Sequence, residues 1–206
     1  MADYVIAGIG TGVGKTLVSA ILTEALEADY WKPIQAGDLE SSDTITVKHL
    51  VSNSSSFFHP ESYRLKTPMS PHAAADIDNI YIDPEKIVPP ETNKRLLIEL
   101  AGGLMVPLNK DCLNIDLLEK WKIPVILVSQ NYLGSINHTL LSCDLLRSRS
   151  IPVHGLIFNG PENKSSEDFI LNYTKLTCIA RIPELKIVNN EIVRTVASKI
   201  NLDLFR

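Results

Sequence analysis

A short glycine-rich stretch near the start of the chain constrains its fold more than any other feature. The letters GIGTGVGKT run from Gly8 to Thr16, at the end of the apolar run DYVIAGI. A loop of this kind between a strand and a helix directs backbone N–H groups and the positive end of the helix dipole toward one place, where an anion binds. The stretch therefore predicts a strand at about 3–9, a helix after it and a phosphate ligand between them.

The second half of this stretch, GVGKT, matches the end of the Walker A pattern G-x-x-x-x-G-K-[ST]. In that pattern the lysine contacts the β- and γ-phosphates of a nucleotide and the hydroxyl binds Mg²⁺. The first half does not match, because Ile9 stands where the pattern requires glycine, and the loop is one residue longer than the strict form. An ordinary glycine-rich turn with an accidental Gly-Lys-Thr is the alternative. The strand before the loop and the helix after it favour a nucleotide site.

The composition excludes several other classes of function. The chain has 206 residues, a net charge of −4 and scattered basic residues. We therefore expect a single domain over residues 1–206 that binds neither nucleic acid nor membrane. The absence of a signal peptide and of a long apolar run predicts a cytoplasmic protein. The three cysteines lack Cys-x-x-Cys spacing and the five histidines form no ligand motif, so neither disulfides nor zinc is expected.

Short apolar runs alternate with segments of helical period along the chain. This alternation predicts an α/β fold, with a mostly parallel sheet flanked by helices on both faces. Strands are expected at 30–34, 95–100, 123–129, 152–159 and 177–182, and helices at 15–28, 42–51, 114–121, 135–148, 166–176 and 190–200. The segment from Ser52 to Pro90 is rich in Ser, Pro and Asn, and we interpret it as an excursion on the substrate side with only short helical pieces.

Polar residues that follow the predicted strands are the candidates for function, because ligands of parallel sheets collect at the carboxyl ends of strands. Lys32 follows a buried strand that Pro33 ends, which brings its amine near the phosphate loop. A surface lysine with a buried stem is the alternative. Glu99 lies at the predicted tip of a strand, directly before the small residues of LAGG, and could bind Mg²⁺. The alternative is an acid satisfied by neighbouring N–H groups.

Two further stretches have both a functional and a structural interpretation. Asp43 in SSD could join the site or cap the helix that follows it. The letters LGSINH, from Leu133 to His138, place a glycine and Ser135 at a predicted helix start behind the most apolar strand. This arrangement predicts a second anion cradle, and plain capping of the helix is the alternative.

The ordered set GTGVGKT, WKPIQAG, SSD, SPHAAA, IELAGG, PVILVSQNYLGSINH, FNG and IPEL resembles the dethiobiotin synthetase family over nearly the whole chain. Each motif alone is weak, whereas the ordered combination with the lengthened phosphate loop is specific. The resemblance implies a P-loop NTPase fold and an ATP- and Mg²⁺-dependent ligase of biotin biosynthesis. Such an enzyme closes 7,8-diaminononanoate and CO₂, or bicarbonate, into dethiobiotin and releases ADP and phosphate. It also implies a homodimer with the substrate near the subunit interface.

The resemblance further implies roles for individual residues. Lys15 and Lys32 would bridge a carbamate and the γ-phosphate, Thr11 would bind the carbamate, and Asn159 would read adenine. The metal ligands would be Thr16, Asp43 and Glu99. The whole nucleotide and metal site would comprise Gly12, Val13, Gly14, Lys15, Thr16, Leu17, Asp43, Glu99, Leu100, Ala101, Gly102, Asn159, Gly160, Pro183, Glu184 and Leu185. The substrate site would comprise Lys32, Ala36, Gly134, Ser135, Ile136 and Asn137, with the N–H groups of Gly134 and Ser135 on the substrate carboxylate.

The chain departs from the family pattern at a few positions. Gly10 and Gly12 stand where the family often carries acidic residues, Ala36 where a hydroxyl is common, and Leu100 where glycine is common. These departures affect substrate detail and not the class of reaction.

The alternative from a different class is a Walker-type switch ATPase of the chromosome-partitioning and septum-positioning kind. Its KGGVGKT loop differs from GTGVGKT at two positions, and its signature lysine would fall on Gly10. Such switches often carry a basic or amphipathic surface for DNA or membrane, which the sequence lacks. A GTPase switch is favoured less, because NKSS at 163–166 lacks the aspartate of the guanine-reading motif N-K-x-D.

Overall fold

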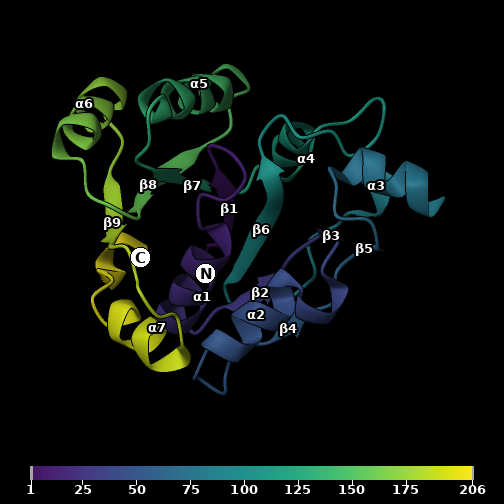
Figure 1. Cartoon of the computed structure of the whole chain (residues 1–206), viewed down its shortest axis with the longest axis horizontal. Helices are drawn as coiled ribbons and strands as arrows, with labels where there is room; N and C mark the ends of the chain where they lie inside the picture. Colours follow the sequence, from purple (N-terminus) through teal and green to yellow (C-terminus); the bar gives the residue numbers. More distant parts are fainter. Residues whose placement is uncertain (1, 206) are drawn as a thin grey trace.

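A seven-stranded, entirely parallel sheet forms the centre of the computed structural model, which describes residues 2–205 (Figure 1). The strand order is β4-β2-β6-β1-β7-β8-β9. These strands are β1 (Tyr4–Gly8), β2 (Asp29–Trp31), β4 (Phe58–His59), β6 (Leu96–Gly103), β7 (Val125–Gln130), β8 (Val153–Asn159) and β9 (Cys178–Ile182). A second, smaller parallel sheet pairs β3 (Ile34–Ala36) with β5 (Tyr63–Leu65).

Helices cover both faces of the large sheet, as parallel strands with crossover connections require. One layer contains α1 (Lys15–Leu26), α2 (Asp43–Leu50) and α7 (Asn190–Ala197). The other contains α3 (Pro71–Asp78), α4 (Asn114–Trp121), α5 (Ser135–Ser148) and α6 (Lys164–Thr174) (Figure 1). Three short 3₁₀ turns, η1 (Leu39–Ser41), η2 (Pro84–Lys86) and η3 (Leu202–Phe205), complete the elements. The predicted α/β fold class is confirmed.

The two layers enclose two apolar cores, one on each face of the sheet. Strand β1 shows how the sequence divides between them. Val5 and Ala7 belong to the core under α4, α5 and α6, whereas Tyr4 and Ile6 belong to the core under α1 and α7. Side chains alternate between the faces of a strand, and because both faces are buried the run reads as continuously apolar. The same property makes β1 easy to recognise in the sequence.

The strand predicted at 30–34 is wrong in its extent. The chain leaves the large sheet after Trp31, and Ile34 begins β3 in the small sheet. Pro33 lies at this break because it lacks the N–H group that a sheet ladder needs. Its carbonyl oxygen instead accepts a hydrogen bond from the Tyr63 N–H at 3.0 Å. Segment 52–90 also contains β4 and β5, which at two and three residues are too short to show a period.

The predicted helices are confirmed; α4 and α5 have the predicted bounds, whereas the ends of α1, α2, α6 and α7 are shifted. Helix α1 ends at Leu26 and not at residue 28, because Glu27 adopts a left-handed conformation with φ +48°. Helix α6 begins two residues earlier than predicted, at Lys164, where the Asn163 side chain accepts a hydrogen bond from the Ser166 N–H at 3.1 Å. Within residues 2–205, no helix has the length and apolarity needed to cross a membrane.

Candidate functional site

The phosphate loop joins β1 to α1 at the carboxyl edge of the sheet. Gly14 precedes the helix with φ +88°, a conformation that favours glycine, and a Cβ atom there would lie 2.1 Å from Nδ2 of Asn159. No described side chain caps α1, and its first turn contains no acid. The N–H groups of that first turn are therefore available to an anion.

Lys15 folds back over this loop. Its Nζ donates a hydrogen bond to the carbonyl oxygen of Gly10 at 3.0 Å, and the residue is only 7% exposed. Burial lowers the pKa of Lys15 to about 8, against the attraction of Glu99 and Asp43. An anion bound in the loop would favour the charged form of this amine. Lys15 therefore lies over the phosphate loop, and its contact with phosphates stays a prediction.

Four charged or polar side chains meet next to the loop, three from different elements and one, Lys32, from the connection after β2. Lys32, directly after β2, forms an ion pair with Asp43 and lies 3.3 Å from Oε1 of Glu99. The Thr16 hydroxyl of α1 lies 2.9 Å from Oδ1 of Asp43 and 3.0 Å from the same Glu99 oxygen. Lys32 is 4% exposed and Glu99 1%. The surface alternative for Lys32 is therefore wrong, and the partners of Glu99 are side chains, not backbone N–H groups.

The position of Glu99 on its strand differs from the prediction. Strand β6 continues to Gly103, so Glu99 lies inside the strand and not at its tip. It pairs with Ile6 of β1, while the neighbouring β2 ends one step earlier, at Trp31 opposite Ile98. The carboxylate reaches the site because β2 has already ended beside it.

Ser42, and not Asp43, caps helix α2. The Ser42 hydroxyl accepts a hydrogen bond from the N–H of Ile45 at 3.3 Å, and the N–H of Asp43 donates to Oε1 of Gln35 at 3.2 Å. Capping as the role of Asp43 is therefore wrong, and its carboxylate is free to contact Lys32 and Thr16.

The charged groups of this cluster stabilise one another in their ionised forms. Burial acts to lower the pKa of Lys32, but Glu99 and Asp43 outweigh it and hold that pKa above its ordinary value. Burial likewise acts to raise the pKa of Asp43, and the charge of Lys32 outweighs it, so the pKa lies below its ordinary value. Lys32 is therefore cationic and Asp43 anionic at neutral pH.

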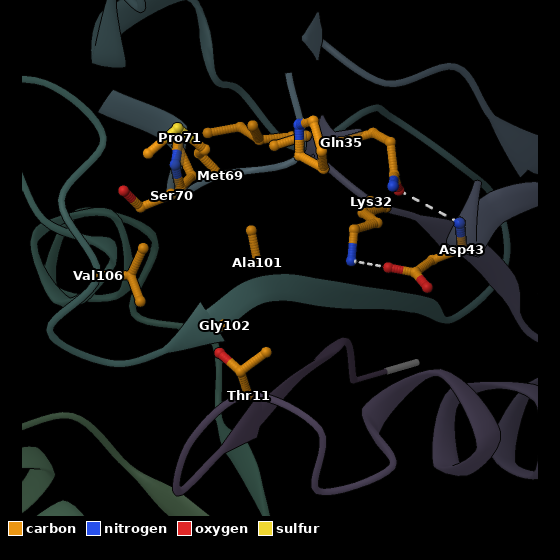
Figure 2. A pocket seen from close by; sticks show the side chains of 13 residues that line it. Thr11, Lys32, Gln35, Asp43, Met69, Ser70, Pro71, Ala101, Gly102 and Val106 are labelled. Atoms are coloured by element: carbon orange, nitrogen blue, oxygen red, sulfur yellow. Dashed lines mark hydrogen bonds and ion pairs between the residues drawn. The ribbon is translucent and has the colours of Figure 1, made fainter. Parts of the chain in front are cut away.

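A cavity of about 380 Å³ opens beside this cluster. Thr11 reaches it from the phosphate loop and Lys32 from the end of β2, with Ala101 of β6 between them (Figure 2). The remaining lining comes from β3, the start of α2, the residues at and just before the start of α3, the end of β6 and the loop that follows it: Ile34, Gln35, Ala36, Asp43, Pro68, Met69, Ser70, Pro71, Gly102 and Val106. The segment interpreted as a substrate-side excursion thus supplies one wall.

The LGSINH stretch includes the start of α5 and lines a different cavity. Gly134 precedes the helix with φ +102° and no described side chain caps it. The Ser135 N–H donates to the carbonyl oxygen of Tyr132 at 3.0 Å, so the expectation that this N–H is available is wrong. Gly134, Ile136 and Asn137 line a cavity of about 790 Å³ that shares no described residue with the cavity at Lys32. Within one chain the two predicted substrate regions are therefore separate.

The predicted adenine contacts lie on the other side of the loop. Asn159 ends β8, is 9% exposed, and donates through Nδ2 to the carbonyl oxygen of Val13 at 3.0 Å. Gly160, Pro183 and Glu184 line a cavity of about 150 Å³, next to the ion pair of Glu167 with Arg181; Leu185 does not line it. Leu100 as a whole is 1% exposed, and its side chain lies in the core.

Sequence reasoning missed three buried polar residues that support the site. The Tyr30 hydroxyl donates to Oε2 of Glu99 at 2.9 Å, and Gln35 holds the first N–H of α2 as described above. Asn114 donates to the carbonyl oxygens of Ala101 and Gly103 at 2.7 and 2.9 Å. Tyr30 and Gln35 lie close to Lys32 in the sequence, and this proximity to a candidate site residue could have identified them. Asn114 has no local signal.

The donor set suits Mg²⁺. Among residues 2–205 no three His, Cys, Asp or Glu side chains cluster as a metal site. Mg²⁺, however, is usually held by one or two carboxylates together with substrate phosphates and water. The convergence of the Thr16 hydroxyl with one oxygen each of Asp43 and Glu99 fits that requirement.

Comparison with solved structures supports the architecture. A ParA family ATPase from Chlorobium tepidum superposes with a TM-score of 0.58 at 12% identity, covering 97% of this chain and 100% of the other. The MinC:MinD cell division complex of Aquifex aeolicus gives 0.59 at 17% identity, with coverage of 97% and 95%. Such low identities show the shared P-loop fold alone.

Sequence comparison is more specific. A family model described as an AAA domain matches residues 2–192. The ATP-dependent dethiobiotin synthetase of Christiangramia forsetii is 55% identical over 197 residues, covering 96% of this chain and 95% of the relative. Those of Agrobacterium fabrum and Cytophaga hutchinsonii are 48% and 47% identical, with coverage of 88% and 86%, and of 97% and 97%. The chain belongs to the ATP-dependent dethiobiotin synthetase family.

Proposed function

We propose that the chain, an ATP-dependent ligase by family, closes 7,8-diaminononanoate and CO₂ into dethiobiotin and releases ADP and phosphate. The observation that carries the proposal is the position of two buried lysines: Lys15 over the phosphate loop, and Lys32 on the wall of the adjoining cavity. The chemistry requires two anions to meet between them.

The reaction has three steps. One amine of the substrate adds to CO₂ and loses a proton, which gives a carbamate. A carbamate oxygen then attacks the γ-phosphorus of ATP, ADP leaves, and a carbamic-phosphoric anhydride forms. The second amine attacks the carbonyl carbon, loses a proton and expels phosphate, which closes the ring. The second step brings a carbamate against a triphosphate, and fixed positive charge in a dry site is the most effective stabilisation of that approach.

The residues of the site have distinct roles in this scheme. Lys15 neutralises the β- and γ-phosphates together with the first N–H groups of α1. Lys32, held in place by Asp43 and Glu99, faces the carbamate. Thr11 offers its hydroxyl to the carbamate from across the cavity. Ala36 lines the same cavity without a polar group, so it shapes the space and donates nothing.

Mg²⁺ would be held by Thr16, Asp43 and Glu99. When bound, Mg²⁺ neutralises charge on the phosphate oxygens and orients them. The nucleotide base would lie toward Asn159, whose Nδ2 is engaged by the Val13 carbonyl group, with Pro183–Leu185 beside it. The Nδ2 contact leaves Oδ1 of Asn159 to accept from the base.

We propose that the substrate carboxylate binds at Gly134 and Asn137 of a second copy in a homodimer. The start of α5 and the cavity at Lys32 do not meet within one chain, while the substrate is one molecule with reacting amines at one end and a carboxylate at the other. Leu133 is fully exposed, and the exposed side chains of Met105 and Leu141 line a cavity of about 380 Å³ that Thr11 also lines. A C₂ contact through such a face would bring the cradle of one subunit to the cavity of its partner.

The test is phosphate release from ATP with Mg²⁺, 7,8-diaminononanoate and bicarbonate, each omitted in turn. We expect release to require all of them and dethiobiotin to appear in equal amount. Turnover that needs no diamine, or that responds to DNA or lipid vesicles, would instead support the switch ATPase alternative.

A further inference from the structure

Tyr30 contacts the site although its side chain lies wholly inside the core. Tyr30 of β2 pairs with Leu97 of β6, and Glu99 lies two residues further along the same strand. Residues two apart on a strand face the same side, so Tyr30 and Glu99 are diagonal neighbours on the α1 face of the sheet. The hydroxyl of Tyr30 donates to Oε2 of Glu99 at 2.9 Å, and the exposed fractions of the two residues are 0% and 1%.

Because of this contact, the two oxygens of the Glu99 carboxylate have different partners. Oε2 accepts from Tyr30, while Oε1 faces Thr16 and Lys32 at 3.0 and 3.3 Å. The terminal torsion of a glutamate is broad, so without a partner on Oε2 the carboxylate could turn and offer either oxygen, or both, to the site. Tyr30 itself cannot move aside, because its ring is packed in the core with Phe58 at a centroid distance of 6.2 Å.

We propose that Tyr30 is a positioning residue that fixes the Glu99 carboxylate so that only Oε1 is offered to the metal and to Lys32. The inference rests on the proposed role of Glu99 in holding Mg²⁺. Hydrogen bonds behind a ligand orient it and commonly change metal affinity by about 10- to 100-fold. Since one hydroxyl is lost and Lys32 and Thr16 remain, we expect a change near the lower end of that range.

The experiment measures metal binding directly. Free Mn²⁺, used in place of Mg²⁺, is followed by electron paramagnetic resonance during titration of the protein with a non-hydrolysable ATP analogue present. Tyr30→Phe is expected to raise the Kd for Mn²⁺ about tenfold, with the affinity for the analogue in the absence of metal unchanged. The matched control is Tyr4→Phe, which removes a hydroxyl from the same core and has no contact with the proposed metal ligands. Its Kd for Mn²⁺ should equal that of the wild type.

A double-mutant cycle with Glu99→Gln separates positioning from structural support. If Tyr30 acts through Glu99, the double variant binds Mn²⁺ as weakly as Glu99→Gln alone. A lower melting temperature of Tyr30→Phe with unchanged Mn²⁺ affinity would overturn the inference and leave the metal role of Glu99 intact. Unchanged affinity in Glu99→Gln as well would overturn the inference together with the proposed metal role.

Discussion

Helices α1 and α5 begin at the same edge of the sheet, and both follow a glycine in a left-handed conformation, Gly14 and Gly134. No described side chain caps either helix. Their surroundings differ. Buried charges surround the start of α1, with Lys15 at 7% and Glu99 at 1% exposure. The start of α5 presents exposed, uncharged side chains such as Asn137.

The difference teaches that a helix start determines where an anion can lie, and the side chains around it determine which anion. The N-terminus of each helix contributes about half a positive charge, which suits one carboxylate. A triphosphate in contact with a carbamate needs whole charges in addition, and these are present at α1 as Lys15 and Lys32. We therefore expect substitutions at the two helix starts to affect different substrates, and by very different amounts.

The largest effects are expected from removal of either lysine. Lys15→Ala and Lys32→Ala should each lower kcat by about 100-fold or more, since an electrostatic contact to a transition state contributes about 3 kcal/mol. Stability separates the two variants. Lys15→Ala loses one hydrogen bond to a carbonyl group, whereas Lys32→Ala leaves Asp43 and Glu99 facing each other without a cation. We expect only Lys32→Ala to lose roughly 3 kcal/mol of unfolding free energy.

Steady-state phosphate release and denaturant unfolding measure the two quantities. Turnover at the wild-type rate in either variant would contradict the proposal that positive charge at the start of α1 stabilises the transition state. Equal stability of both variants would show that the buried ion cluster is not a structural element.

An intermediate effect is expected from Glu99→Gln. The substitution keeps the size and the hydrogen bond to Tyr30 but removes the charge, so the Mg²⁺ concentration for half-maximal activity should rise about tenfold. Asp29→Asn is the matched control, because Asp29 is also buried, at 4% exposure, and its carboxylate accepts hydrogen bonds from the Phe57 N–H and the Thr92 hydroxyl at the start of β2, away from the proposed metal ligands. An unchanged Mg²⁺ titration for Glu99→Gln would reduce Glu99 to a structural acid.

The smallest effect is expected at α5. Asn137→Asp places a negative charge where the substrate carboxylate would bind, and should raise the KM for the diamine about fivefold, since exposed like charges repel by about 1 kcal/mol. The KM for ATP should change little, and the effect should diminish at high salt. Asn137→Ala serves as the uncharged control and should have a smaller effect on the diamine. If Asn137→Asp instead weakened ATP, the cradle would belong to the nucleotide.

Features that depend on neighbouring residues could be predicted from the sequence, and features that depend on residues distant in the chain could not. The phosphate loop, Lys32 and the parallel sheet were predictable because a glycine pattern, a proline and an apolar run act over a few neighbouring residues. The prediction failed for β3, β4 and β5, which have two or three residues each and exist only through their partners. It also failed for Tyr30 and Asn114, whose polar atoms are satisfied by residues distant in the chain.

The sequence by itself determined the fold class and the family, because local patterns and their order along the chain carry that information. The tertiary structure decided how the candidate side chains are arranged. In the folded chain Ser42 caps α2, so the Asp43 carboxylate is available for other contacts, and Glu99 lies inside β6 beside the end of β2. The tertiary structure also separated the two substrate regions of one chain. Strand register and the termination of neighbouring strands set these distances, and both depend on pairing between segments far apart in the sequence.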